Sequence, residues 1–210
     1  INKEILDEIA ISKFEYEEIV NKLKREPSQL ELGLFGALWS EHCGYKHTKK
    51  LLKKLSDNSN DLPVKLGAEN AGVIDIGNNI SIVMKIESHN HPSAIEPFQG
   101  AATGVGGIIR DIFAMGARPV AILNSLRFGL PENKKNKYII NGVVAGISHY
   151  GNCIGIPNVG GEVYFSKTYE GNPLVNAMCV GIIKNNKIMS AKADQPGDLL
   201  VLVGSETGRD

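Results

Sequence analysis

The chain has 210 residues, of which 42% are hydrophobic and 22% charged, as is ordinary for a globular protein with a sizeable buried core. Basic and acidic residues both number 23, so a formal net charge of zero gives no general attraction to nucleic acid or to an anionic membrane. No apolar stretch approaches the roughly 20 residues of a membrane helix. The composition therefore predicts a protein with neither nucleic-acid nor membrane partners.

The three cysteines, Cys43, Cys153 and Cys179, are odd in number and lack CxxC spacing. This pattern argues against both a disulfide framework and a structural zinc site. The charged N-terminus is unlike a secretory signal peptide. We therefore expect free thiols in a reducing compartment and a cytoplasmic protein.

The N-terminal part is expected to be helical. Residues 14–25 have a charged helical pattern, and Ser28 with Glu31 forms a capping-box pattern that predicts the start of a second helix. Apolar residues recur at helical spacing in this second helix, at Leu30, Leu34, Ala37 and Leu38. A third, basic helix is expected over residues 48–55, followed by a polar loop at 56–62.

A β-hairpin is predicted next, with strands at 72–77 and 80–88 and a turn at Asn78-Asn79. Alternation along the second strand places three apolar residues on the face expected to meet the core, namely Ile82, Met84 and Ile86. The other face carries Lys85, Glu87 and, if the strand continues, His89. At about 6.7 Å per two residues, these three side chains would form a row about 13 Å long. A nucleoside triphosphate with its metal and part of a second substrate would fit that length.

Residues 100–115 predict a glycine-rich turn that enters a helix. The expected buried stripe of this helix is Val105, Ile108, Ile109 and Ile112. Later elements are predicted to be a strand at 119–128, a helix at 138–150, and strands at 159–165, 174–183 and 199–203.

This element order predicts an α+β fold, a layered α/β arrangement in which helices cover a mixed sheet. We expect a helical linker at 1–27, a main domain at 28–185, and the start of a second α/β domain at 186–210, opened by the last strand. The chain lacks an initiator Met and stops at a turn-like sequence, so we expect more protein to follow.

Residues 87–111 concentrate side chains that can hold a metal and phosphates. Mg²⁺ would select the carboxylates of Glu87 and Asp111, and the Arg110 guanidinium would clamp phosphate. Pairing of Arg110 with Asp111 on a solvated helix face is the alternative. His89 and His91 could instead form an H-x-H zinc pair on a strand, as in zinc hydrolases. The glycines match neither a Walker A loop nor a dinucleotide fingerprint, and close helix packing explains them as well as phosphate binding does.

A second group follows the predicted end of the helix near residue 39. His42 would titrate near neutral pH if unperturbed. A nucleophilic pair of Cys43 and His42 is disfavoured, because adjacent residues rarely present both side chains to one atom. Core packing is the alternative reading of Trp39 and Tyr45. The turn at residues 160–162, Gly-Gly-Glu, could approach a ligand or could be an ordinary strand turn.

Five stretches carry a family resemblance: 38–46 (LWSEHCGYK), 69–72 (ENAG), 87–119, 172–177 (NPLVNA) and 207–210 (TGRD). Together they resemble formylglycinamide ribonucleotide amidotransferase, also called phosphoribosylformylglycinamidine synthase. The similarity is to the synthetase subunit of the multi-subunit form and covers nearly the whole chain from Ser28.

The resemblance implies an ATP-dependent step of purine biosynthesis. ATP would activate the formamide oxygen of formylglycinamide ribonucleotide as an iminophosphate, and ammonia from glutamine would displace phosphate to give the amidine. By matching position, His42 and His89 would be the active-site histidines, with His89 as proton acceptor. Tyr45 and Lys85 would contact ATP, and Glu87 and Asp111 would bind Mg²⁺. The ribonucleotide would be bound by Ser88, His89, Asn90, His91 and Arg110.

The resemblance also implies the N-terminal domain fold of aminoimidazole ribonucleotide synthetase. In that fold two copies pair, and their sheets close into a barrel. The second copy would come from the same full-length chain or from a homodimer partner. A glutaminase subunit and a small accessory subunit would complete the complex. Because further substrate and metal residues would lie downstream, we expect little or no synthetase activity from these 210 residues alone.

Three alternative functions remain. A relative such as aminoimidazole ribonucleotide or selenophosphate synthetase is disfavoured by the sequences at 39–42 and 88–92. A zinc hydrolase would use His89 and His91. A non-catalytic assembly or nucleotide-sensing domain would bind ATP without turnover.

Overall fold

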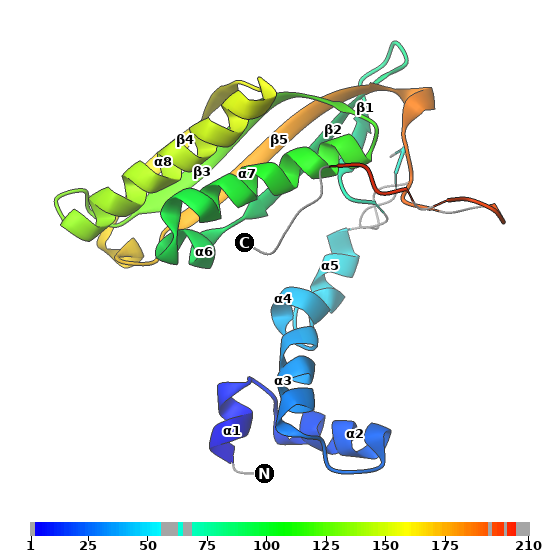
Figure 1. Ribbon diagram of the computed structural model, residues 1–210, viewed down its shortest axis with the longest axis vertical. Coiled ribbons are helices and arrows are strands. Elements are labelled where there is room, and N and C mark those ends of the chain that lie inside the picture. The colour runs from blue at the N-terminus through cyan, green and yellow to red at the C-terminus, as the bar shows by residue number, and fades with distance from the viewer. Residues whose placement is uncertain (1–2, 56–62, 65–68, 193–194, 200, 205–210) are drawn as a thin grey trace. The chain divides into compact units, whose positions relative to one another are not determined.

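The computed structural model describes residues 3–55, 63–64, 69–192, 195–199 and 201–204 (Figure 1). The chain divides into two compact units, residues 1–60 and 61–210. Within the described ranges, no helix is both long and apolar enough to cross a membrane.

The first unit is helical, with α1 at Lys3–Glu8, α2 at Lys13–Leu23, α3 at Gln29–Leu38, α4 at Glu41–Gly44 and α5 at Lys49–Leu55. Its core is formed by Leu6, Ile11, Ile19 and Leu32. Because Leu32 of α3 packs with Ile19 of α2, the expected domain boundary between residues 27 and 28 falls inside this unit.

The capping box predicted at Ser28 is confirmed. Ser28 Oγ accepts a hydrogen bond from the Glu31 backbone N–H at 3.3 Å, and Glu31 Oε2 accepts one from the Ser28 N–H at 2.8 Å. Hydrogen bonds from the Arg25 guanidinium, more than those from Ser28, lower the pKa of Glu31 to about 2. Leu32 is 2% exposed, whereas the stripe at helical spacing remains exposed, at Leu30, Leu34 and Leu38.

The second unit contains a five-stranded sheet in the order β1-β2-β5-β3-β4. The strands are β1 at Gly72–Asp75, β2 at Ile80–Ser88, β3 at Arg118–Phe128, β4 at Asn158–Phe165 and β5 at Leu174–Lys184. Only β3 and β4 pair in parallel, and the other neighbours are antiparallel, so the predicted mixed sheet is confirmed. Single 3₁₀ turns lie at Lys167–Tyr169 and Asn185–Lys187.

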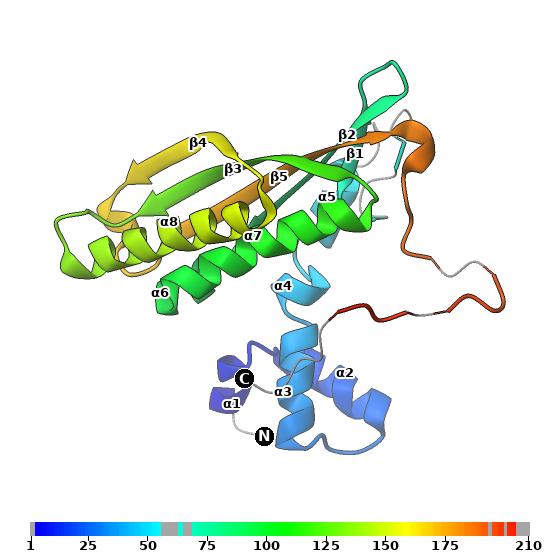
Figure 2. The ribbon, with the colours of Figure 1, turned by 45° about the horizontal axis from the view of Figure 1, so that its top comes forward.

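Helices cover one face of this sheet. α7 at Pro97–Ala114 and α8 at Lys134–Ile154 run side by side across it, and the short α6 at Asn90–Ile95 precedes α7 (Figures 1 and 2). α8 is the crossover that the parallel β3–β4 pair requires. The predicted stripe of α7 is confirmed, because Val105, Ile108, Ile109 and Ile112 are at most 1% exposed.

The predicted hairpin is confirmed. Asn78 and Asn79 have φ angles of 54° and 62°, and β1 pairs antiparallel with β2. Two successive left-handed residues are what a tight hairpin turn of this hand requires, and asparagine adopts that conformation at lower cost than most residues.

The face of β2 that meets the core was predicted wrongly. Val83 is fully buried beneath the helices, and it shares its face with Lys85. Ile82 and Met84 are only half-buried and Ile86 is 62% exposed. Alternation separates the two faces of a strand, but it does not tell which of them the helices cover.

The glycine-rich stretch is also corrected. α7 begins at Pro97, so Gly100 and the glycines after it lie inside the helix and do not form a turn. A side-chain carbon at Gly146 of α8 would lie 2.2 Å from the Phe98 carbonyl oxygen, and one at Gly106 would lie 2.6 Å from the Tyr150 ring. Glycine therefore sets the close approach of α7 and α8.

Two further expectations concern the chain's ends and its cysteines. Residues 195–199 and 201–204 form no strand, and Leu199 and Leu202 are 86% and 98% exposed, so the strand predicted at 199–203 is wrong in this structure. An isolated strand has no neighbour for its backbone hydrogen bonds.

The cysteines are free as predicted, and burial raises the pKa of Cys179 to about 11. The loop predicted at 56–62 lies outside the described residues.

Replacing Gly146 by Ala should destabilise the second unit by about 1–3 kcal/mol, because the methyl group would overlap the backbone of α7. Chemical denaturation followed by circular dichroism measures the change. Gly33→Ala in α3 is the matched control. Open space surrounds that position, so the same methyl group should stabilise its helix by about 0.5–1 kcal/mol. Unaltered stability of Gly146→Ala would contradict the close packing of α7 on α8.

Candidate active site

Lys85 on β2 forms an ion pair with Asp111 on α7, with Nζ 3.1 Å from Oδ2. The ammonium also donates a hydrogen bond to the Asn70 carbonyl oxygen at 2.9 Å. Both charged side chains are partly exposed, at 34% and 21%. The alternative that Asp111 pairs with its neighbour Arg110 is therefore wrong, because the partner comes from the sheet.

Glu87 lies next to α7 at Gly107. A methyl group at Gly107 would lie 3.3 Å from Glu87 Oε2 and 3.8 Å from an Arg110 guanidinium nitrogen. That first distance is tighter than most side-chain carbons adopt, so the glycine leaves room for the carboxylate against the helix. Arg110 itself is exposed, and no carboxylate pairs with it in the described part of the chain.

His89 packs against α7 at Gly104. A methyl group there would lie 3.1 Å from His89 Cβ and 3.2 Å from Cγ. The His89 backbone N–H donates to the Val175 carbonyl oxygen at 2.8 Å, which fixes the turn that follows β2. Its ring Nδ1 is buried and has no hydrogen-bond partner among the residues that the structure describes.

The structure thus confirms that these three side chains lie in a row, in the order predicted from strand alternation. Lys85, Glu87 and His89 meet the helix at Asp111, Gly107 and Gly104. The step from residue 104 to residue 111 rises about 10.5 Å along a helix, close to the length of the row on the strand. The row can offer a cation, a carboxylate and an imidazole in succession, and Asp111 and Arg110 add a second carboxylate and a second cation.

The turn after the row departs from a strand. β2 ends at the exposed Ser88, and His89 precedes α6, which contains Asn90 and the exposed His91. Asn90 Oδ1 accepts a hydrogen bond from the Val175 N–H at 2.7 Å, so this side chain ties the turn to β5.

The zinc reading of His89 and His91 required both residues on one strand, and they are not so placed. Across the described ranges, no group of three or more His, Cys, Asp or Glu side chains could hold a metal ion.

The remaining candidates belong to the first unit. His42 lies in α4, but its side chain is outside the described part of the structure. Tyr45 follows α4 in a left-handed conformation with φ of 50° and is 51% exposed, so the core-packing alternative is wrong for this residue. Core packing does describe Trp39, which packs against the core of the first unit with its ring edge-on to Phe35 and the two ring centroids 5.1 Å apart. Cys43 is exposed.

Two supporting features were not predicted from the sequence. One is the Asn70 carbonyl that holds Lys85, and the other is a cavity of about 330 Å³ beside His89, lined by residues of α6 and α7 that include Gln99 and Thr103. The motif at Glu69–Gly72 was the sequence signal that could have pointed to the Asn70 carbonyl. The polar residues Gln99 and Thr103, four apart in the sequence, were the signal that could have pointed to the cavity.

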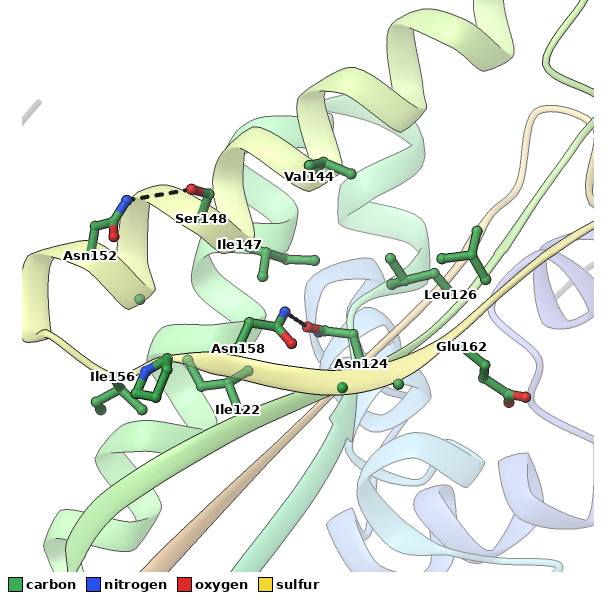
Figure 3. A pocket seen from close by; sticks show the side chains of 15 residues that line it. Ile122, Asn124, Leu126, Val144, Ile147, Ser148, Asn152, Ile156, Asn158 and Glu162 are labelled. Atoms are coloured by element: carbon green, nitrogen blue, oxygen red, sulfur yellow. Dashed lines mark hydrogen bonds between the residues drawn. The ribbon is translucent and has the colours of Figure 1, made fainter.

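A larger cavity of about 520 Å³ lies between α8 and the strands β3 and β4 (Figure 3). Asn158 donates a hydrogen bond to Asn124 on its strand side. Gly161 in its wall has a φ of 139°, and a side-chain carbon there would lie 1.8 Å from the Asn124 carbonyl oxygen. Close strand packing therefore explains Gly161, whereas open space surrounds Gly160. The stretch at residues 160–162, considered above as a possible ligand contact, lies in β4 and lines this cavity, whereas none of the residues assigned a catalytic, nucleotide, substrate or metal role does.

Family models match both units of the chain. The family model for AIR synthase related protein, N-terminal domain, matches residues 68–183, and that for the formylglycinamide ribonucleotide amidotransferase linker domain matches residues 2–46. The phosphoribosylformylglycinamidine synthase subunit PurL of Caldanaerobacter subterraneus subsp. tengcongensis is 60% identical over 203 residues. That similarity covers 97% of this chain and 28% of the relative, so the chain spans little more than a quarter of the relative's length.

Solved structures of Thermotoga maritima PurL are also similar to this chain. Its complexes with FGAR and with ATP are each 49% identical to this chain, with TM-scores of 0.71 and 0.70. Each similarity covers 88% of this chain, and 28% and 30% of the respective solved chains. By the match over residues 68–183 and by its fold, the chain belongs to the family of AIR synthase related proteins.

Proposed function

We propose that this chain forms part of a phosphoribosylformylglycinamidine synthase. In this reaction ATP and ammonia convert formylglycinamide ribonucleotide to formylglycinamidine ribonucleotide. The observation that carries the proposal is the row of Lys85, Glu87 and His89 against the glycines of α7. The similarity to PurL proteins, including one complexed with FGAR and one with ATP, supports it.

The Lys85 end of the row would take ATP. Its ammonium is a point charge suited to phosphate, and Tyr45 is the second residue proposed for the nucleotide. Glu87 and Asp111 fit Mg²⁺, because this ion is commonly held by one or two carboxylates together with substrate phosphates. When bound, the ion would neutralise developing charge on the phosphates. Asp111 would then exchange its present partner, Lys85, for the metal.

The His89 end would take the glycinamide carbonyl group, and not the formamide, because the product formylglycinamidine ribonucleotide keeps the formyl group and has its amidine at the glycinamide carbon. The γ-phosphate of ATP would be transferred to the oxygen of this carbonyl, ammonia would add to the carbonyl carbon, and the transferred phosphate would then leave. The ammonia nitrogen must lose protons as the amidine forms, and His89 is proposed as the acceptor. His42 is the second proposed active-site histidine. The ribonucleotide would be held by Ser88, Asn90, His91 and Arg110 together with His89.

The open face of the sheet supports the proposed second half. Ile74, Ile86 and Ile182 are 45–62% exposed on it, opposite the helices. Burial of such side chains against a second sheet is favourable. We propose that a second synthetase-like half, from the same full-length chain or from a homodimer partner, covers this face. A glutaminase subunit and a small accessory subunit would complete a cytoplasmic complex.

His89→Ala, in a chain of the relatives' full length, should lower the rate of amidine formation with ammonia about 100-fold or more, as expected for loss of a general base. ATP binding, measured by calorimetry, should persist, because Lys85 is untouched. His149→Ala on α8 is the matched control and should turn over normally. Near-normal turnover of His89→Ala would refute the role of His89.

Asp111→Asn should raise the Mg²⁺ concentration for half-maximal activity about tenfold or more, because a neutral amide binds this hard cation less well. A Mg²⁺ titration of the ammonia-dependent rate measures the shift. Asp7→Asn on α1 makes the same change at an aspartate that is not part of the row and should leave the titration unaltered. An unchanged Mg²⁺ requirement in Asp111→Asn counts against Asp111 as a ligand.

A further inference from the structure

The Asn70 carbonyl oxygen is a backbone group that holds the ATP end of the row in place. It accepts a hydrogen bond from Lys85 Nζ at 2.9 Å, while Asp111 Oδ2 lies 3.1 Å from the same ammonium. Lys85 has a flexible four-carbon stem, so these two acceptors set where its charge lies. If Asp111 binds Mg²⁺, as proposed above, the Asn70 carbonyl is the acceptor that remains. The position of this carbonyl therefore bears on how the ammonium meets phosphate.

The neighbouring residue, Glu69, fastens this segment to a part of the chain that is distant in sequence. Ser190 Oγ donates a hydrogen bond to Glu69 Oε1, and the Ala191 backbone N–H donates one to Oε2 at 3.2 Å. These hydrogen bonds, the one from Ser190 foremost, lower the pKa of Glu69, and the positive charge of Lys192 adds to the effect. The carboxylate is thus ionised at neutral pH, and both of its oxygens accept hydrogen bonds from this one segment.

The segment that binds the carboxylate is itself anchored on α7. It follows β5 and the second 3₁₀ turn, and the Met189 N–H donates a hydrogen bond to the Met115 carbonyl oxygen at 3.1 Å. A side-chain carbon at Gly116 would lie 2.9 Å from Met189 Cγ, so the two parts of the chain are in close contact. Met115 lies one helical turn beyond Asp111. Residues 189–191 therefore connect the end of α7 to the segment that precedes β1.

These contacts form a closed loop around the Lys85 ammonium. One of its acceptors, Asp111, belongs to α7, and the other, Asn70, adjoins Glu69. A carboxylate that binds a serine at the surface usually does no more than hold a loop, but this loop contains an acceptor for the cation of the row. Within the described part of the chain Lys85 pairs with Asp111 and not with Glu69. An effect of Glu69 on the ammonium therefore passes through the backbone of residue 70.

We propose that Glu69 is a positioning residue for ATP. By holding its segment against residues 190–191, the carboxylate fixes the Asn70 carbonyl and, through it, the Lys85 ammonium that would meet the phosphates of the nucleotide. This role rests on the function proposed above and belongs to a side chain that touches neither substrate. Glu69 thus affects the affinity for ATP and leaves that for the ribonucleotide unaltered, because His89 lies at the other end of the row.

Steady-state kinetics and calorimetry in a chain of the relatives' full length test this role. Glu69→Ala should raise both the KM and the Kd for ATP about three- to tenfold, the effect expected from loosening one hydrogen bond. Ser190→Ala removes a donor from the other side of the contact. It should act in the same direction but more weakly, because the Ala191 N–H remains. The KM for the ribonucleotide should stay unchanged in both variants.

Glu170→Ala is the matched control for a purely structural effect. This carboxylate also ties two segments together, because it accepts hydrogen bonds from the Leu130 N–H at 3.3 Å and from the side-chain amides of Asn133 and Asn136 at 3.1 and 2.8 Å. The variant should lower the thermal midpoint at least as much as Glu69→Ala does, yet leave the KM for ATP unchanged. A similar rise of that KM in the control would overturn the role of Glu69, since any loosening of the unit would then have the same effect.

A double-mutant cycle with Lys85→Gln separates positioning from direct contact. If Glu69 acts through Lys85, Glu69→Ala should weaken ATP binding no further once the ammonium is gone. An additive loss of ATP affinity in the Lys85→Gln background would overturn the role, as would an unaltered KM for ATP in Glu69→Ala. Absence of amidine formation in the unmodified chain would instead reject the proposed function, and the ATP affinities from calorimetry would still decide the role of Glu69.

Discussion

The site depends on how closely the end of β2 approaches α7. Strand side chains reach a helix this closely only where the helix has no side chain of its own, and Gly104 and Gly107 provide those places. The His89 ring and the Glu87 carboxylate lie there, and the Lys85–Asp111 ion pair closes the row one turn farther along. The same geometry leaves Thr103 and Arg110 on the exposed side of the helix, beside the row.

This arrangement carries a cost in stability. Each glycine in a helix interior is destabilising by about 0.5–1 kcal/mol relative to alanine, and α7 contains four. The buried stripe from Val105 to Ile112 offsets that cost, because its side chains are almost fully removed from water. The sequence of α7 thus has a lower helix propensity at the positions that β2 side chains approach closely, and such local departures are common at functional sites.

Much of the fold and of the row could be predicted from the sequence. The hairpin at Asn78-Asn79, the cap at Ser28 and the stripe of α7 have strong local signals, and strand alternation placed Lys85, Glu87 and His89 together. Three features had no local signal. The covered face of β2 depends on where the helices pack. The partner of Asp111 comes from a distant strand, and the glycines suggested a turn because their packing partners lie elsewhere in the chain.

The most direct test of this account is Gly107→Ala in a chain of the relatives' full length, with Mg²⁺ titration of the ammonia-dependent rate. The added methyl group meets the end of the Glu87 side chain and no backbone atom, so the fold should be retained and the thermal midpoint should not fall. The carboxylate should be displaced, and we predict a lower maximal rate together with a higher Mg²⁺ requirement. Unchanged rate and Mg²⁺ requirement in a folded Gly107→Ala protein would contradict the claim that these glycines exist to admit the row.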